Sequence, residues 1–534
     1  MFRPLSFTTR YFLCGLLILV PLTIANAQFK AGIQGTITDT GGGLVPDAKV
    51  TLTNTETGKT QETTSSADGF YRLSGLAPGK YKLTVEKAGY RQKIFDSVIV
   101  NAEAVQGVDV PLEPGEVSAT VTISQDTEAT LDTENANIDK AITTQEVKSL
   151  PQFGRDPYNL IRLTPGVFGE GARSSSGQSA NLPNQPGPGG SNRSIFQTEN
   201  QVQISADGQR VTSNNFQIDG TSVNSLTHGG AAVITPNQES IKEVRVIANA
   251  YSAEFGRNSG AQILTVSQNG TNLFHGSLFL KNDSAGLNSF NKYGGFNNAS
   301  PVRVNTHLNQ FGGSLGGPLP IPRFGEGPPP AFKLARDKAF FFFSYEGLRS
   351  TISDTVNSFV ETPEYRGLIQ QLRPNSIATR ILTSSGATPR VIGVIPVGCT
   401  AAGFGAGSTG CNQLPGGLDI GSPTGVQGQY VLSSNPIGGG LDNIPDIEFA
   451  QLAVPSTNKG NQYNLRLDFN LTAKDSLALS GYRSIFSADQ SDSSANSRPM
   501  ADVTTHPINS LFTFTYTRTI SSTMINEARF NATR

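Results

Sequence analysis

Tryptophan is absent from the 534 residues of the sequence, and only three cysteines, three methionines and four histidines are present. The histidines stand far apart, without the spacing of metal ligands or of a catalytic pair. The sequence therefore predicts no metal site, no cofactor and no nucleophile–histidine chemistry. A surplus of positive charge is missing too, because 41 basic residues are matched by 42 acidic ones. Binding to nucleic acid is thus not predicted.

Glycine is abundant instead, with 57 residues, and Asn, Ser and Thr are frequent. This composition is typical of a β-rich protein with many turns, and it lacks the Ala, Leu, Glu and Lys bias of a helical one. We therefore expect a mainly β fold, divided into several domains because of the length of the chain.

Residues 1–27 have the three parts of a secretory signal peptide. Arg3 and Arg10 form a basic start, the apolar run YFLCGLLILVPLTI follows, and residues 25–27 (Ala-Asn-Ala) provide a cleavage site of small residues. The apolar run is too short for a permanent membrane anchor. The mature chain is expected to start near Gln28, outside the cytoplasm.

Residues 28–113 alternate between short apolar strands and turn residues. Turns such as Asp68-Gly69 and Pro78-Gly79 separate the strands at a spacing of roughly ten residues, which predicts a compact β-sandwich. The segments VPDA, DGFY and LAPGKY resemble the carboxypeptidase regulatory-like domain, which has a carbohydrate-binding-like fold. We call residues 28–113 the sandwich.

Residues 114–137 have the polar, Thr- and Glu-rich composition of a linker that contains one β-prone patch, Glu116–Ile123. Beyond the linker, residues 141–150 and 157–163 have the apolar periodicity of two short helices. Strand patterns and glycine turns follow, so residues 138–270 are predicted to form a small α+β unit.

From residue 271 onward the apolar pattern has a period of two. In YNLRLDFNL (463–471), Tyr, Leu and Phe occupy one face, and Asn, Arg and Asp the other. A soluble antiparallel sheet and a transmembrane β-barrel both produce this alternation. Charged residues in mid-strand fit the wet interior of a barrel, and the aromatic face fits lipid, so we favour an antiparallel transmembrane barrel. The predicted strands lie near residues 273–282, 306–316, 338–347, 463–471, 475–487, 508–519 and 523–532.

Four consecutive phenylalanines, Phe340–Phe343, fall in one predicted strand. Because a strand sends alternate side chains to opposite faces, Phe341, Phe343 and Tyr345 are assigned to lipid. The interior face receives Phe340, Phe342, Ser344 and Glu346. The inward phenylalanines then need a partner inside the barrel. Phe341→Arg is expected to impair membrane assembly far more than Glu346→Arg.

A long Gly- and Pro-rich tract, residues 393–449, separates two of the strands, as expected of an extracellular loop in an outer-membrane barrel. Cys399 and Cys411 lie in this tract, and in an oxidising compartment they could close a small disulfide loop.

Two glycine-rich motifs match catalytic signatures in their letters only. Gly312–Gly316 fits G-x-S-x-G, but a Gly-Pro run follows where a nucleophile elbow needs a helix. Gly405–Gly410 fits G-x-G-x-x-G, but it lies in a loop without a βαβ unit. No catalytic residues are assigned, and the sequence does not predict an enzyme.

Several segments resemble the Oar-like TonB-dependent outer-membrane transporters. ITTQEVKSLPQFGRDPYNLIRLTPGV resembles the start of their plug domain, and NNFQIDGTSVN and KAFFFFSYEGLRS resemble later parts. The resemblance implies a plugged barrel of about 22 strands, so we call residues 138–270 the plug segment. The predicted strands are too few to close such a barrel. Residues 271–534 are therefore expected to be its incomplete start, in an N-terminal fragment of a longer protein.

The resemblance further implies a Gram-negative-type outer membrane, with the sandwich in the periplasm. Its implied function is import of a siderophore, glycan or peptide by TonB-coupled plug movement. The implied partners are outer-membrane lipid, the extracellular ligand and the TonB–ExbB–ExbD complex, which supplies energy that the outer membrane lacks.

TonB is expected to pair with an extended segment by strand addition. The candidate residues are Glu116, Val117, Ser118, Ala119, Thr120, Val121, Thr122 and Ile123. The alternative is that this patch is simply the last strand of the sandwich. Asn215, Asp219 and Gly220 belong to a motif typical of the family, and we interpret them as turn and hydrogen-bonding residues.

Two other functions remain open from the sequence. One is a surface or adhesion protein, and the other is carbohydrate binding by the sandwich. Sugar sites usually present rows of exposed aromatic rings, whereas Phe70, Tyr71 and Tyr81 stand where the core of a sandwich needs some of them. A structural or docking module is therefore favoured for the sandwich.

Overall fold

The computed structural model describes residues 31–534, apart from 116–119, 124–136, 151–154, 170–185, 188–190, 193–194, 197–199, 203, 228, 252–254, 257, 288–304, 323–331, 406–409, 421, 424–429, 432–440, 491–496 and 522–523. The predicted signal peptide lies outside the described residues, as does the first half of the candidate TonB contact. Among the residues described, no helix is long and apolar enough to cross a membrane.

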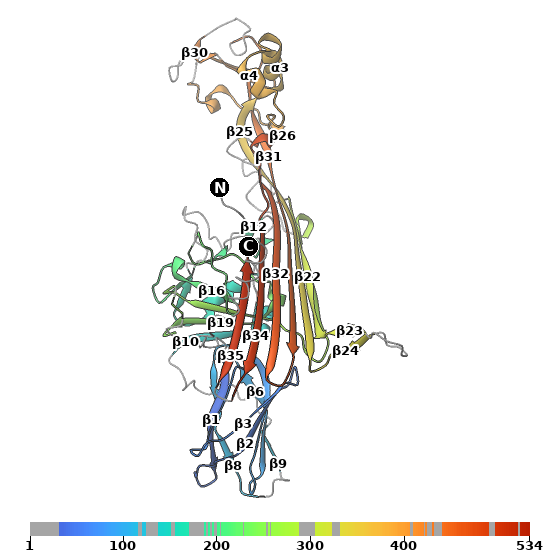
Figure 1. The fold of residues 1–534 in the computed structure, drawn as a ribbon. Coiled ribbons are helices and arrows are strands. Elements are labelled where there is room, and N and C mark those ends of the chain that lie inside the picture. Colours follow the sequence, from blue (N-terminus) through green and yellow to red (C-terminus); the bar gives the residue numbers. More distant parts are fainter. Residues whose placement is uncertain are drawn as a thin grey trace, which may run out of the picture.

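The sandwich consists of two sheets, drawn in blue in Figure 1. One sheet has the order β4-β1-β7, with β8 also paired to β1, and the other has the order β3-β2-β5-β6-β9. Their bounds are β1 (Gly32–Asp39), β2 (Lys49–Asn54), β3 (Thr60–Thr64), β4 (Phe70–Ser74), β5 (Gly79–Glu86), β6 (Gln92–Val100), β7 (Val105–Gly107), β8 (Val110–Leu112) and β9 (Thr120–Ile123).

The core of the sandwich forms because its strands alternate. In β5, Tyr81, Leu83 and Val85 are buried, and the residues between them are not. Tyr71 is buried too, and its hydroxyl donates to the Val108 carbonyl at 2.7 Å, while the Tyr81 hydroxyl donates to that of Ala77 at 2.7 Å. These two aromatic rings therefore serve the core, whereas Phe70 is exposed.

The plug segment contains a five-stranded sheet of order β10-β19-β20-β16-β17, which mixes parallel and antiparallel pairs. Its helical elements are α2 (Thr144–Ser149), η1 (Pro157–Leu163), η3 (Val211–Ser213) and η4 (Gln238–Ser240). Its strands are β10 (Ile138–Thr143), β11 (Val167–Gly169), β12 (Pro186–Gly187), β13 (Ser191–Asn192), β14 (Asn200–Gln201), β15 (Ile204–Ala206), β16 (Asn215–Ile218), β17 (Thr221–Ser222), β18 (Ala231–Ala232), β19 (Ile241–Asn249) and β20 (Gln262–Ser267).

The first predicted helix begins three residues later than expected. Residues 141–143 belong to β10, which pairs with β19, and this pairing outweighs their helical periodicity. Helix α2 begins after Thr143, whose hydroxyl accepts from the Glu146 amide, while the Glu146 side chain accepts from the Thr143 amide. This capping box fixes the helix start.

The barrel segment forms an antiparallel sheet whose main strands follow the sequence order, and we call this sheet the barrel wall. It lies beside the plug segment and above the sandwich in Figure 1. All seven predicted strands are present: β21 (His275–Ser284), β22 (Asn305–Pro318), β25 (Ala339–Glu361), β31 (Ile447–Asn470), β32 (Asp475–Gln490), β34 (Ile508–Thr519) and β35 (Ile525–Thr533).

The two faces of the barrel wall follow the predicted parity. On β25, Phe340 and Phe342 are 1% exposed and Ser344 and Glu346 are fully buried, whereas Phe343 is 40% exposed. The ring of Phe342 stacks on that of His275 of β21, which lies beyond β22 in the sheet. The wall thus has a packed inner face and an open apolar outer face, as a partial barrel requires.

Strands β25 and β31, with 23 and 24 residues, are much longer than the roughly 10 residues that cross a membrane. Their far ends carry a lobe, which lies at the end of the wall opposite the sandwich (Figure 1). Cys399 and Cys411 form a disulfide there, with their Cα atoms 6.0 Å apart. The lobe contains α3 (Pro363–Leu372), α4 (Ile377–Leu382), β26 (Val391–Val394), η7 (Cys399–Ala402), β27 (Cys411–Leu414), β28 (Gly417–Ile420), β29 (Ser422–Pro423) and β30 (Tyr430–Val431).

The remaining short elements are η5 (Ala285–Leu287), β23 (Pro320–Pro322), β24 (Phe332–Leu334), η8 (Pro499–Ala501) and β33 (Val503–Thr505). The G-x-S-x-G match lies inside β22, where Ser314 pairs with residues of both β21 and β25. A mid-strand serine has no nucleophile elbow, which agrees with the prediction from sequence.

Candidate functional site

The plug segment packs directly against the inner face of the barrel wall. Tyr482 and Leu511 of the wall belong to the same apolar core cluster as the plug residues Val244 and Ile263. Gln462 of the wall donates to the carbonyls of Ile195 and Thr235, at 2.9 and 2.8 Å. We take this contact as the candidate functional site, because it joins the plug segment to the inner face of the wall.

Asp219 and Gly220 form the turn between β16 and β17. Both residues have positive φ angles, 48° and 72°, as a two-residue hairpin turn of this kind requires. A Cβ on residue 220 would lie 1.7 Å from Nη1 of Arg529 in the wall, so only glycine fits without a shift of that side chain. The turn therefore presses against the wall.

The carboxylate of Asp219 joins the turn to both the plug sheet and the barrel wall. It accepts from the Ser267 amide at 2.9 Å and from the Ser480 hydroxyl at 3.2 Å. Nη1 of Arg466 lies 3.4 Å from Asp219 and donates to the Ser267 hydroxyl at 2.8 Å, while Nη2 donates to Asp468 at 3.0 Å. Arg466 thus links the plug segment to the wall through buried charge.

A second charged cluster lies around Glu239 of η4. Its carboxylate pairs with Lys148 at 2.6 Å and Arg155 at 3.2 Å, and it accepts from the Ser277 hydroxyl of the wall. Burial alone would raise the pKa of Glu239, but the hydrogen bonds from Lys148 and Ser277 and the positive charges of Lys148 and Arg155 lower it. The carboxylate is therefore held ionised at this contact.

Arg155 connects this charged cluster to two residues of the barrel wall. Its Nε lies 3.6 Å from the carboxylate of Glu346, and its guanidinium carbon lies 3.6 Å from the centre of the Phe279 ring. Phe279 is an apolar residue on the otherwise polar inward face of β21, and its ring supports a plug cation there. Glu346→Arg would place a like charge beside Arg155 and should weaken this contact, while the expected larger effect of Phe341→Arg on membrane assembly stays a prediction.

Asn215, the third motif residue, lies inside the plug segment. Its amide donates to the Gln262 side chain at 2.6 Å, and its side-chain oxygen accepts from Asn224. These bonds tie β16 to its neighbours in the plug sheet. Only Asp219 and Gly220 of the predicted motif reach the wall.

Residues 266–534, which include the whole barrel wall, match the family described as outer membrane beta barrel domain. The chain belongs to this family. Residues 32–113 match the carboxypeptidase regulatory-like domain. This outer-membrane barrel protein is located in the outer membrane, as the sequence predicted.

The outer-membrane barrel protein is similar to the TonB-dependent transporter Oar of Myxococcus xanthus, with 27% identity over 311 residues. The match covers 57% of this chain and 27% of the relative, so the chain spans about a quarter of that length. The resemblance to Oar-like TonB-dependent proteins is thereby confirmed.

Two solved structures of outer-membrane proteins are also similar to the chain. A mutant of the ferric enterobactin receptor from Pseudomonas aeruginosa has 13% identity and a TM-score of 0.36, covering 74% of this chain and 40% of the receptor. The outer membrane transporter YddB from Escherichia coli has 12% identity and a TM-score of 0.37, covering 72% and 37%. The relative is named as a transporter, and the two structures as a receptor and a transporter.

The candidate TonB contact of the outer-membrane barrel protein falls partly in the sandwich. Thr120–Ile123 form β9, which pairs in parallel with residues 92–95 of β6 and ends the β3-β2-β5-β6-β9 sheet. Residues 116–119 lie outside the described residues. The strand that the linker patch predicted exists, and it joins the sandwich as the alternative interpretation proposed.

Several residues of the site were not singled out from the sequence, namely Lys148, Arg155 and Glu239. Nothing in their local sequence distinguishes them from ordinary surface charges, since their partners lie on distant strands. Glu346 and Arg466 were assigned to the barrel interior by the alternation of side chains along their strands. This inward position was the only feature of the sequence that pointed to their role in the contact with the plug segment.

Proposed function

We propose that this protein is a TonB-dependent receptor and transporter, in which movement of the plug segment opens a path for an extracellular ligand. The observation that carries the proposal is the plug segment sealed against the inner wall by paired charges such as Asp219 with Arg466. Buried ion pairs fix a packed arrangement, yet they can be exchanged for water when an external force separates the surfaces.

The proposal includes the organisation predicted from the sequence, with a periplasmic sandwich, a linker at residues 114–137, the plug segment and the barrel segment. Its partners would be the TonB–ExbB–ExbD complex, lipid and a siderophore, glycan or peptide. Strand β9 supports the TonB contact, because it lies at the end of its sheet, where strand addition takes place.

Growth of a strain that lacks the gene tests the transport function. We expect lost uptake of one defined siderophore, glycan or peptide, restored by the wild-type gene. A strain with normal growth and uptake on all of them, but with lost adhesion, would contradict the proposal. For the TonB contact, deletion of residues 116–123 should abolish crosslinking to TonB, whereas deletion of residues 124–131 serves as the matched control.

Adhesion is a second candidate because of the lobe. Its helix α4 and strand β26 expose apolar side chains, with Ile377 75% and Ile392 56% exposed. Exposed apolar patches often mark protein contacts. Carbohydrate binding by the sandwich is less supported, since Tyr71 and Tyr81 are committed to its core.

A further inference from the structure

Two side chains of β19, Glu243 and Arg245, hydrogen-bond to one peptide unit of the sandwich, that of Ala102, and we call this contact the grip. Both carboxylate oxygens of Glu243 accept from the backbone amide of Ala102, each at 3.1 Å, and Arg245 donates to the carbonyl of the same residue. Ala102 is fully buried, and Arg245 is 2% exposed. The bond from the Arg245 guanidinium is charge-assisted and therefore stronger than a neutral one, and burial keeps water from both contacts.

Arg245 also connects this grip to the edge of the plug sheet. Its guanidinium pairs with Asp139 of β10, the first strand of the plug segment. The sandwich, β10 and β19 are therefore joined through a single buried side chain. Removal of the sandwich would take away the backbone partners of both Glu243 and Arg245.

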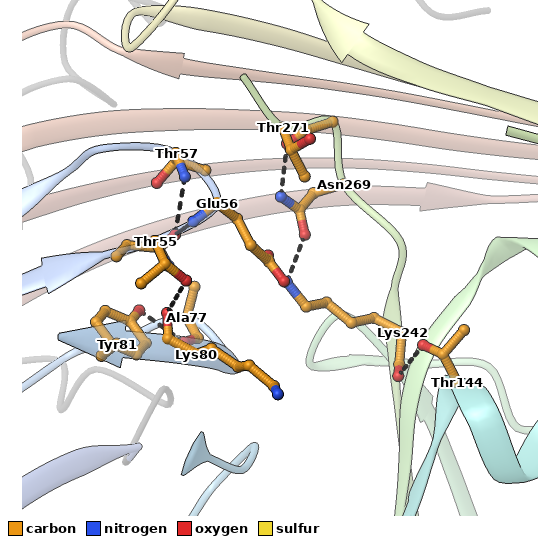
Figure 2. A network of polar contacts seen from close by, with 12 residues as sticks. Thr55, Glu56, Thr57, Ala77, Lys80, Tyr81, Thr144, Lys242, Asn269 and Thr271 are labelled. Atoms are coloured by element: carbon orange, nitrogen blue, oxygen red, sulfur yellow. Dashed lines mark hydrogen bonds and ion pairs between the residues drawn. The ribbon is translucent and has the colours of Figure 1, made fainter. Parts of the chain in front are cut away.

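A second contact lies beside the first, at the turn after β2. Nζ of Lys242 lies 2.6 Å from the carboxylate of Glu56 and donates to the Asn269 side chain at 2.9 Å. Figure 2 shows Lys242 reaching from β19 toward Glu56 and Asn269, with Thr144 bonded to the Lys242 backbone behind it. Two adjoining contacts resist rotation better than one.

The contact of the sandwich with the barrel wall is of a different kind. The Asn272 amide, which precedes β21, donates to the Glu56 carbonyl at 2.9 Å, and Gly58 approaches the exposed Asp337. A cavity of about 170 Å³ lies where the sandwich, the plug segment and the wall meet, and Tyr81, Lys242 and Arg466 are among the residues that border it. A backbone hydrogen bond and an exposed carboxylate join the sandwich to the wall here, whereas the groups that join it to the plug segment at Ala102 are buried. The sandwich–wall boundary is therefore the weaker of the two.

We propose that the sandwich and the plug segment move as one body, so that a pulling force applied to the sandwich is transmitted to the plug segment. This inference rests on the proposed TonB-dependent function. Strand β9 is paired to β6, and a force on the segment that follows the sandwich therefore acts first on the sandwich. The grip of β19 on Ala102 passes that force to the plug segment, and separation occurs along the contacts of the sandwich with the wall.

Two cysteine pairs on one sandwich turn test the inference in the complete protein in cells. The first pair, Glu56→Cys with Lys242→Cys, joins sandwich to plug, and the second, Thr57→Cys with Asn272→Cys, joins sandwich to wall. A short bis-maleimide is added to cells with and without TonB. The native Cys399 and Cys411 are bonded to each other and do not react.

The sandwich–plug pair is expected to crosslink equally in both strains. The sandwich–wall pair is expected to lose crosslinking when TonB is present. The reverse pattern, with the plug leaving a sandwich that stays on the wall, would overturn the inference, and so would loss of both crosslinks.

A second measurement separates this inference from the TonB function. The purified protein in detergent is crosslinked at increasing urea concentrations. The sandwich–wall crosslink should disappear at a lower concentration than the sandwich–plug crosslink, and the opposite order or a joint loss would overturn the one-body inference. If this order holds while neither crosslink depends on TonB in cells, the TonB-coupled function fails and the one-body inference stands.

Discussion

The inner and outer faces of the barrel wall are built from the same strands, but they meet different surroundings. The outer face exposes Leu278 and Phe343 without polar partners, whereas the inner face places Arg466 and Glu346 against plug residues of opposite charge. Lipid accepts any apolar side chain at little cost, while a buried charge needs one particular partner. The outer face is thus specified by composition and the inner face by individual pairs.

Removal of a charge on the inner face is expected to have the largest effect, and it tests whether individual ion pairs specify that face. Arg466→Ala leaves the buried Asp219 and the half-buried Asp468 without their cation, and we expect a loss of about 3–5 kcal/mol in the free energy of unfolding. Urea denaturation of the purified protein measures the change.

Arg518→Ala is the matched control on the next strands of the wall. Arg518 lies 3.5 Å from Asp475 and its side chain is 58% exposed, so its loss should cost less than about 1 kcal/mol. Equal losses for Arg466→Ala and Arg518→Ala would mean that the Arg466 contacts do not hold the plug segment.

The outer face is tested by a charge placed in lipid. Phe343→Arg should reduce assembly into the outer membrane, at a cost of about 2–4 kcal/mol if the residue lies near the middle of the bilayer. Heat-modifiable mobility in gels and the amount in outer-membrane fractions report assembly. Thr355→Arg, exposed on the same strand where it extends beyond β22, is the control, and normal assembly of both variants would refute the lipid assignment.

The Asp219-Gly220 turn of the plug segment, which lies against the inner face of the wall, offers a test with a smaller expected effect. Gly220→Ala forces a side chain into a positive φ of 72° and against Arg529, so we expect a loss of about 1–2 kcal/mol in the free energy of unfolding. Gly256→Ala should have almost no effect, because a Cβ there meets no atom within 4 Å. Equal stability of the Gly220→Ala and Gly256→Ala proteins would contradict the close contact of the turn with the wall.

The smallest expected effect concerns the plug surface that faces the sandwich. Burial raises the pKa of Glu243 to about 7, against the hydrogen bond from Ala102 and the charges of Arg245 and Lys242. An acid with a raised folded pKa stabilises the protein below its unfolded pKa, and that stability is lost as the pH rises through about 7.

The melting temperature of the wild-type protein should therefore fall between pH 6 and pH 8, a window that contains the raised pKa. Glu243→Gln should reduce this fall, because a glutamine does not titrate. Glu239→Gln is the comparison, since the lowered pKa of Glu239 affects stability only at more acidic pH. An identical fall in wild type and Glu243→Gln would contradict the assignment.

The strands of the wall could be predicted from the sequence because alternation depends only on neighbouring residues. The same local logic identified the Asp219-Gly220 turn and the inward position of Glu346. The partner of Glu346 could not be predicted, since Arg155 reaches it from the plug segment, and no pattern within either segment encodes the distance between them. The helix start at Thr143 was missed for a similar reason, because β19 pairs with the residues before it.

The lobe was expected only as a long loop. The sequence could not show that β25 and β31 continue as a paired ribbon far beyond the other strands, because their outer parts lack a lipid-facing pattern. Likewise, nothing in the sequence of β19 shows that Lys242, Glu243 and Arg245 contact the sandwich, because these contacts join segments far apart in the chain.

The central claim is that the plug segment closes the inside of an outer-membrane barrel. Conductance of the complete protein in a planar lipid bilayer tests it most directly, with and without residues 138–270. The account predicts a closed protein when the plug segment is present and a large, persistent conductance when it is deleted. An assembled deletion variant that conducts no more than the wild type would contradict the claim.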